Sequence, residues 1–567
     1  MSAPVVGGGP DLDHPGVVAI VERRAACAAP EAVRCSGTLV APRVVLTAAH
    51  CLDGRRADEL EVVIGADLRG PAGAALAVQD AALHPGYVPG QLAAGHDLAL
   101  LLLAEPAATP PIALVDAPPP ELIVGALADV GVPADEAWLR LDLVPVDPTY
   151  VATFTDGTEL TLPRGTDAVE AEIAARLGER DAAGTGRLFG WLRQLYDAEF
   201  GTFIDRNFHR PREFADRRTL TDAATLLRLG GLTDMSSKVS SFISDERLQR
   251  LFTFQALYAG VPPQRAAAIY GVIAQMDIGR GVWHPRGGIG RVGSVLADAL
   301  TDTGGDLRLS TTATRIVTSG HRVTGVSTDT GFIAADAVVA TVPPPVVASL
   351  LGRPLPRGPR WRRVRYSPSA VVVHGIVPRS VTSSWPGHHH TISFGQAWAE
   401  TFDDLIGKPG RLMRDPSFLI TRPAFSDPDG YIAADPALSE VEAVSMLAPC
   451  PNLHTADLAW DAITDPYVAE CLRTLEDRGF GGIVAGLRIE RVDTPRTWAG
   501  SGLPAGTPFG AAHTLTQTGP LRTPNAWPSL PNLLLAGSAT IPGVGIPPVL
   551  ISGRLAAERV LESWDRS

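Results

Sequence analysis

The stretch Leu535-Ala-Gly-Ser-Ala-Thr-Ile-Pro-Gly-Val-Gly-Ile-Pro-Pro-Val-Leu-Ile-Ser-Gly-Arg554 decides the fold of the longer part of this chain. The apolar run 533–536 predicts a short buried strand, and the apolar spacing from Pro548 onward predicts a helix. A strand, a glycine loop and a helix start present free backbone N–H groups and a positive helix end to an anionic ligand. Because Gly543 and Gly545 lack a Cβ, a flat ring or a phosphate can approach the main chain, although an ordinary turn also uses such glycines.

The same stretch is part of a longer series of motifs. The pattern Gly-Ser-x-Thr-x-Pro-Gly-x-Gly-x-Pro, residues 537–547, is followed by Ser-Gly-Arg-Leu-Ala-Ala-Glu-Arg, residues 552–559. Further blocks precede it in a fixed order: Gln255–Pro263, Ala268–Ile273, Gly281–Gly288, His389–Gly395 and Gly510–Leu515. Together these blocks resemble the bacterial-type phytoene (carotenoid) desaturases over about residues 118–563.

This resemblance implies an α/β flavoprotein of the desaturase and amine-oxidase type, spanning residues 118–567. Its helical and substrate parts would cover about 121–275 and 360–500, and its FAD domain about 276–345 and 505–563. The implied activity is FAD-dependent dehydrogenation of a lipophilic polyene in carotenoid biosynthesis. By motif match, the residues expected beside the flavin are Gly537, Ser538, Gly543, Gly545, Ile546 and Pro547.

The part of the family that seats the nucleotide is missing from its usual place. The family opens with a strand, a Gly-x-Gly-x-x-Gly turn and a helix, which hold the pyrophosphate and ribose. Here the family-like sequence starts near Glu121. The stretch Val5–Pro10 has Leu12 at the third glycine position, and the formal match Gly288–Gly293 does not follow a predicted strand. We therefore expect a truncated FAD domain and impaired FAD binding.

Protease-like sequence stands where that unit should be. The blocks are Val5-Val-Gly-Gly8, Cys35-Ser-Gly-Thr-Leu-Val40, Leu46-Thr-Ala-Ala-His-Cys51 and His96-Asp-Leu-Ala-Leu-Leu101. They resemble the first half of a trypsin-like serine protease over about residues 5–113. The resemblance implies an all-β half of a double barrel in a domain 1–115, with His50 as general base, Asp97 as its orienting carboxylate and a disulfide between Cys35 and Cys51.

The protease resemblance is also incomplete. No Gly-Asp-Ser-Gly-Gly block exists in the 567 residues. A His–Asp pair without its serine has no group to attack an acyl carbon, so we expect no peptidase activity. His50 and Asp97 would then be a partial, relic dyad.

Composition limits the classes of partner and compartment. Apolar residues make up 45% of the chain and the net charge is −12, which favours a large core and argues against nucleic-acid binding. No apolar run reaches the roughly 18 residues of a membrane span, and no secretory leader is visible. We expect a cytoplasmic protein, with peripheral membrane association left open; Cys35 and Cys51 would stay reduced there. No metal site is expected, because the adjacent histidines 388–390 should face opposite sides of an extended segment.

Local patterns give the order of elements. A proline-rich segment predicts the junction between the protease-like and desaturase-like regions at about residues 104 to 120. The Asp-Gly pair in Phe154–Thr158 predicts a hairpin. Strands are predicted at Val17–Val21, Ser36–Val40, Val44–Thr47, Leu60–Ile64, Leu98–Leu103, Leu307–Leu309, Ala313–Val317, Arg322–Ser327 and Ala337–Ala340, the last four rejoining the flavin sheet. Helices are predicted at Ala168–Leu177, Leu188–Tyr196 and Val292–Leu300.

Three functions remain open from the sequence. The first is a desaturase-like flavoenzyme with a protease-like addition. The second is an inactive fusion, or a chimera of two broken genes. The third is a protease-like module that binds another protein through its half barrel. Bound flavin would separate the first from the other two.

Overall fold

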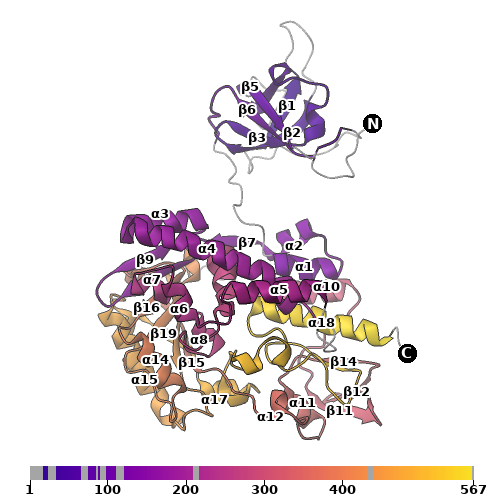
Figure 1. Ribbon diagram of the computed structural model, residues 1–567, viewed down its shortest axis with the longest axis vertical. Coiled ribbons are helices and arrows are strands. Elements are labelled where there is room, and N and C mark those ends of the chain that lie inside the picture. Colours follow the sequence, from indigo (N-terminus) through magenta and orange to yellow (C-terminus); the bar gives the residue numbers. More distant parts are fainter. Residues whose placement is uncertain are drawn as a thin grey trace. The chain divides into compact units, whose positions relative to one another are not determined.

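The computed structural model describes residues 17–22, 33–64, 74–84, 87–89, 97–109, 121–207, 216–430 and 438–564. It divides into two compact units, residues 1–116 and 117–567, which are drawn in Figure 1 and treated separately below. The glycine-containing stretch Val5–Pro10 and most of the expected junction lie outside the described residues.

The first unit is a closed barrel of six antiparallel strands in the order β1-β2-β3-β6-β5-β4. Alternating residues of each strand point inward, and Ile20, Leu39, Val45 and Leu101 form its fully buried core. The strands are β1 Val17–Glu22, β2 Val33–Ala41, β3 Val44–Thr47, β4 Leu60–Ile64, β5 Ala74–Leu83 and β6 Ala99–Leu103. The predicted all-β half barrel is confirmed, but β5 was not predicted, because its alanine-rich sequence lacks the β-branched residues that mark strands.

The second unit is built on a mixed seven-stranded sheet in the order β19-β15-β18-β17-β16-β8-β9. Its strands are β8 Tyr150–Phe154, β9 Glu159–Leu162, β15 Ser369–Pro378, β16 His390–Phe394, β17 Phe418–Thr421, β18 Val441–Cys450 and β19 Arg488–Asp493. The β8–β9 pair is the hairpin that Asp156 and Gly157 predict. Three smaller sheets pair β7 Leu143–Val146 with β10 Val282–Pro285, join β11 Ala313–Ser319, β12 Arg322–Thr328 and β13 Phe332–Ala334, and pair β14 Val338–Ala340 with β20 Leu533–Leu535.

Helices pack against this sheet through two cores. One core joins strand residues such as Ala152 and Ile392 to Leu188 and Leu192 of α4, and the other joins Val444 and its neighbours to α15. The helices are α1 Glu121–Asp129, α2 Ala134–Leu141, α3 Thr166–Leu177, α4 Glu179–Glu199, α5 Arg217–Arg228, α6 Met235–Ser240, α7 Glu246–Leu251, α8 Ala256–Ala259, α9 Val272–Ala274, α10 Gly290–Asp302, α11 Pro344–Leu350, α12 Pro359–Arg362, α13 Arg379–Thr382, α14 Trp398–Ile406, α15 Trp460–Asp477, α16 Ile483–Gly486, α17 Pro495–Gly500 and α18 Ile546–Trp564. None of these described helices has the length and apolar character that crossing a bilayer requires.

Several sequence predictions in the second unit are wrong in detail. Leu307–Leu309 forms no strand; its two leucines are 44% and 76% exposed, so no core fixes them. Strands β11 and β12 form their own sheet with β13 and do not rejoin the β14–β20 pair. Helix α18 starts at Ile546, two residues before the predicted start, because prolines are tolerated in a first helical turn, where the N–H groups have no partner inside the helix.

Candidate functional site

The glycine loop, residues 536–547, connects β20 to α18 and is held from both sides. Gly537 donates its N–H to Ser552 Oγ of α18 at 2.7 Å, and a Cβ built on Gly537 would lie 3.1 Å from the Thr341 carbonyl. Gly537 and Gly545 have φ values of +102° and +109°, in the region that favours glycine. The loop therefore needs glycine at these positions to run from the strand to the helix end.

Arg522 fixes the loop from inside the protein. Its guanidinium is fully buried and donates to the carbonyls of Thr540 at 2.9 Å, Ser538 at 2.8 Å and Ala511 at 3.3 Å. Burial lowers the pKa of Arg522 to about 10, so the side chain stays positive at neutral pH. The carbonyls of Ser538 and Thr540 in the loop thus point toward a buried cation.

His513 and Tyr270 continue this buried polar cluster. The ring of Tyr270 meets that of His513 edge to face, with centroids 5.6 Å apart. Burial and, to a smaller extent, the charge of Arg522 lower the pKa of His513 well below its usual range. His513 is therefore a neutral imidazole beside the glycine loop.

Two pockets are lined by residues that are neighbours in sequence, and one of them includes Ser538 of the glycine loop. One is lined by Pro343, Arg360, Trp361, Gly510 and Ser538 among others. The second is apolar and is lined mainly by aromatic and aliphatic side chains, including Tyr258, Phe394, Trp398, Phe418 and Phe509. Phe509 lines the apolar cavity and the next residue, Gly510, lines the cavity of the glycine loop. A long apolar ligand in one cavity would therefore lie close to a ring held in the other.

Two buried acids stand at π-helical turns of the second unit. Glu199 comes just before the turn Phe200–Ile204 and Asp277 lies within the turn Gln275–Gly279. Burial raises the pKa of Glu199 to about 8 and that of Asp277 to about 7, and Tyr150 donates to Asp277 at 3.2 Å. Such turns are frequent at functional sites. Both carboxyls can hold or release a proton near neutral pH.

The described residues fit one end of an FAD molecule better than the other. A flat ring system with a polar edge suits the pocket at Ser538, because glycines of the loop and the positive start of α18 lie beside it. The backbone N–H donors there are those of Gly545 and Ile546, since Pro547 has none. For the nucleotide end, the only parallel strands beside the loop in the described ranges are β14 and β20, and no glycine turn to a helix follows β14.

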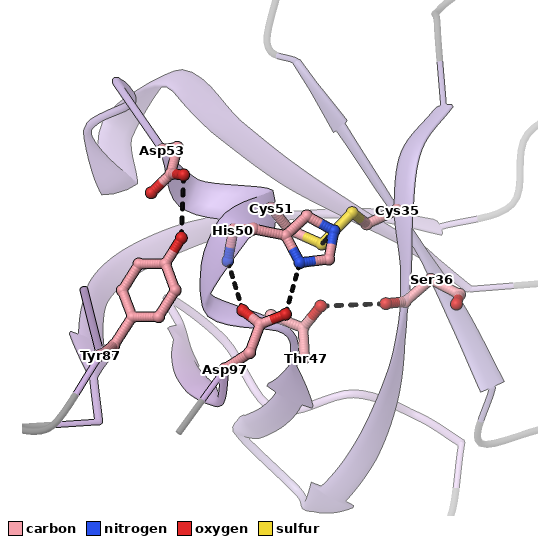
Figure 2. Close-up of a disulfide and its surroundings, with 8 residues drawn as sticks. All are labelled: Cys35, Ser36, Thr47, His50, Cys51, Asp53, Tyr87 and Asp97. Carbon is pink, nitrogen blue, oxygen red and sulfur yellow. Dashed lines mark hydrogen bonds and ion pairs between the residues drawn. A yellow bond between two sulfur atoms is a disulfide. The ribbon is translucent and has the colours of Figure 1, made fainter. Parts of the chain in front are cut away.

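In the first unit, the expected dyad is assembled (Figure 2). The ring atom His50 Nδ1 lies 2.6 Å from Asp97 Oδ2. The backbone N–H of His50 donates to Asp97 Oδ1 at 2.8 Å. The hydrogen bond from the His50 side chain lowers the pKa of Asp97, so the carboxylate is ionised and orients the ring. Cys35 and Cys51 form the disulfide that the protease resemblance implies, contrary to the reduced thiols expected for a cytoplasmic protein. No hydroxyl group of the described residues bonds to the other ring nitrogen, His50 Nε2.

Neither cluster of metal-ligand residue types forms an evident metal centre. Among the described residues, Cys35, His50 and Cys51 bring ligand atoms within 4.8 Å of one another, but the two sulfurs are joined in the disulfide and are not thiolates. The prediction that the histidines 388–390 face opposite sides is wrong for two of them: the rings of His389 and His390 have centroids 4.5 Å apart. Burial lowers their pKa values to about 2 and 4, so both rings are neutral.

The sequence placed the glycine loop but not the residues that support it. Arg522, Glu199 and Asp277 were not singled out, because a lone charged residue in an apolar stretch does not reveal its partners. The signal in the sequence that could have identified these residues is a charged residue within an apolar stretch, since buried ionisable groups cluster at functional sites.

Comparison with known proteins agrees with this geometry. The family model described as flavin containing amine oxidoreductase matches residues 148–561, and the trypsin model matches residues 10–130. A phytoene dehydrogenase of Streptomyces griseus is 44% identical over 448 residues, which cover 78% of this chain and 83% of the relative. A zeta-carotene-forming phytoene desaturase of Myxococcus xanthus is 30% identical over 432 residues, 75% of this chain and 80% of the relative. The chain therefore belongs to the flavin containing amine oxidoreductases, in the family of the phytoene dehydrogenases and desaturases, with a trypsin-like region at its N-terminal side.

Proposed function

We propose that the second unit is an FAD-dependent oxidoreductase that dehydrogenates a long polyene of the phytoene type, in carotenoid biosynthesis. The observation that carries this proposal is the apolar cavity that adjoins the glycine loop through Phe509 and Gly510. The two closely related proteins named above act, by their names, on phytoene. An apolar cavity lined by aromatic rings is the environment that such a hydrocarbon requires.

The residues of the glycine loop would hold the flavin ring. Gly537, Ser538 and Gly543 would lie beside the ring, and Gly545, Ile546 and Pro547 would face it from the helix start, with the positive end of α18 behind them. When bound, FAD would supply the two-electron oxidant that removal of two hydrogens from a C–C unit requires. The chain itself positions the polyene, excludes water, and offers Glu199 and Asp277 as groups that can take up a proton at near-neutral pH.

The first unit, which we assign to residues 1–115, has a different proposed role. His50 and Asp97 reproduce the orienting half of a catalytic triad, without a serine. Acyl transfer begins with attack of the serine hydroxyl on the carbonyl carbon, and a histidine base without that serine cannot start it. We propose that the unit is a non-catalytic module attached to the desaturase, which spans residues 118–567.

A peripheral position on the cytoplasmic side of a membrane would suit a lipid-soluble substrate. Helix α5 supports this proposal, because it carries the exposed apolar residues Leu220 and Leu227 beside Arg217, Arg218 and Arg228. Apolar and basic groups on one helix favour an anionic lipid surface.

The test is conversion of phytoene by the purified full-length chain in the presence of saturating FAD. The expected result is an FAD-dependent product with a longer conjugated system, seen as a new visible absorption band. Gly545→Val should abolish it, since valine is strained at φ +109°. Gly553→Ala, in open space on α18, is the matched control and should retain it. Bound FAD without any product would contradict the proposed reaction.

A further inference from the structure

The two sulfur atoms of the first unit's disulfide lie beside the second ring nitrogen of His50 (Figure 2). His50 Nε2 is 3.8 Å from Cys51 Sγ, and the ligand atoms of Cys35, His50 and Cys51 all lie within 4.8 Å of one another. Nδ1 of the same ring is held by Asp97 Oδ2 at 2.6 Å. The carboxylate thus fixes the ring proton on Nδ1 and leaves Nε2, beside the sulfurs, with an available lone pair.

These separations suit a tetrahedral zinc ion once the disulfide is opened. Zn–S bonds of about 2.3 Å and Zn–N bonds of about 2.0 Å place a sulfur and a nitrogen ligand roughly 3.5 Å apart, and two sulfur ligands roughly 3.8 Å apart. The distance of 3.8 Å between His50 Nε2 and Cys51 Sγ is already close to the first value. The Cα atoms of Cys35 and Cys51 are 6.1 Å apart, so rotation of the side chains can separate the thiolates while the backbone stays in place.

The surroundings of His50 are also those of a zinc-bound histidine. Such a histidine usually donates its other ring N–H to a carboxylate, which orients the ring and raises its basicity, and Asp97 occupies that position. The His50 side chain is 46% exposed, whereas Cys51 is buried. An ion can therefore enter from solvent past the histidine and meet the sulfurs behind it. Three protein ligands leave the fourth position of the ion to water.

We propose that the first unit binds one zinc ion through Cys35 Sγ, Cys51 Sγ and His50 Nε2 when its disulfide is reduced, and releases the ion when the disulfide forms again. A dithiol reductant gives two electrons and two protons to the disulfide and itself becomes a disulfide. Zinc then displaces the two thiol protons and forms two Zn–S bonds. A disulfide oxidant takes the two electrons back, restores the sulfur–sulfur bond and frees the ion. This inference does not depend on the activity of the second unit.

The experiment uses the full-length chain and Co²⁺ as a coloured probe for zinc. The protein is reduced with a phosphine, which has no thiol to compete for the ion, and is desalted without oxygen. We expect the reduced protein to bind one Co²⁺ with the charge-transfer bands of cobalt–thiolate bonds, and one equivalent of Zn²⁺ to remove those bands. The oxidised protein should bind either ion at least about 100-fold more weakly, because it offers no thiolate.

Three variants test the individual ligands. Cys35→Ser removes one sulfur and leaves the other cysteines of the chain in place, and it should lose the cobalt–thiolate bands. Asp97→Asn keeps all three ligands and should weaken zinc binding about 10- to 100-fold, because the amide lacks the charge that orients and polarises the ring. His84→Gln changes an exposed histidine of the same unit and is the matched control, with unchanged binding.

Hydrogen exchange shows whether the ion binds the folded barrel. Zinc should slow exchange in strands β2 and β6 of the reduced protein, because binding stabilises the state that holds the site. The inference would be overturned by a reduced protein without cobalt–thiolate bands, by bands that persist in Cys35→Ser, or by equal binding to the oxidised protein. Zinc that binds without slowing exchange in the barrel would also overturn it, since the ion would then be held by free thiols elsewhere.

Discussion

Gly543 lies directly against His513: a Cβ built on the glycine would stand 2.7 Å from Cε1 of the imidazole. Side chains do not tolerate such a separation, so any residue larger than glycine must displace either the ring or the loop. The ring is confined by Tyr270 and by the neighbouring guanidinium of Arg522. The glycine loop and the buried polar cluster are therefore one packed structure.

Replacing Gly543 with alanine should consequently disturb the flavin end of the site. We expect Gly543→Ala to weaken FAD binding at least about 10-fold, since the loop must shift by several tenths of an ångström against a close-packed interior. Flavin fluorescence titration measures the effect. Gly553→Ala, whose added methyl group meets nothing within 4 Å, is the control and should bind FAD normally. Equal affinities for both variants would show that the loop does not contact the cofactor.

Removing the Arg522 guanidinium should destabilise the second unit. Arg522→Met leaves three buried carbonyls, those of Ala511, Ser538 and Thr540, without their donor. We expect a loss of about 3 kcal/mol in the free energy of unfolding, measured in urea. Arg308→Met removes only an exposed pair with Asp306 and should change stability by less than about 0.5 kcal/mol. Similar small effects for both would mean that the buried bonds are replaced by water.

The carboxyl of Glu199 predicts a pH dependence of stability. Burial raises its pKa from 4.5 to about 8, so between these values the native state keeps a proton that the unfolded chain releases. This contribution to stability is complete below about pH 4.5 and is lost as pH rises through about 8. Glu199→Gln cannot lose that proton.

The stability difference between Glu199→Gln and the unmodified protein should therefore grow in favour of the variant from pH 5 to pH 9. Urea unfolding at a series of pH values measures it. Glu400→Gln, on the exposed side of α14, is the control. A difference that is independent of pH would show that Glu199 is ionised in the folded protein.

The Cys35–Cys51 disulfide should stabilise the first unit alone. Its sequence separation of 16 residues corresponds to about 3 kcal/mol of restricted chain entropy in the unfolded state. Reductant should accelerate hydrogen exchange across the barrel strands and leave those of the second unit unchanged. The two cysteines described in the second unit, Cys450 and Cys471, are free thiols and serve as an internal control. Unchanged exchange in the barrel would contradict this role.

The sequence predicted elements best where a local pattern and the core agree. Val44–Thr47, which alternates in burial, and Leu60–Ile64 were predicted to the residue, and the strand at Leu533–Leu535 lies fully buried. Leu307 and Leu309 show a similar apolar pattern, but no partner strand covers them. Strand formation depends on contacts distant in sequence, which a single short pattern cannot supply.

In the candidate site, too, the sequence identified the residues of a local motif and missed those that depend on distant contacts. Motif resemblance located Gly537, Ser538, Gly543 and Gly545, and the structure brings these residues into one loop. It could not locate Arg522, whose bonds reach residues 11 to 18 positions away, or Glu199, whose burial comes from packing far along the chain.

The most direct test of the account is the conversion of phytoene by the full-length chain with saturating FAD, followed by visible absorption and chromatography of the product. The account predicts a product with a longer conjugated system that forms only with FAD and disappears in Gly545→Val. Unchanged phytoene, in a sample whose FAD titration shows a saturated site, would contradict the assignment of this protein as a carotenoid desaturase.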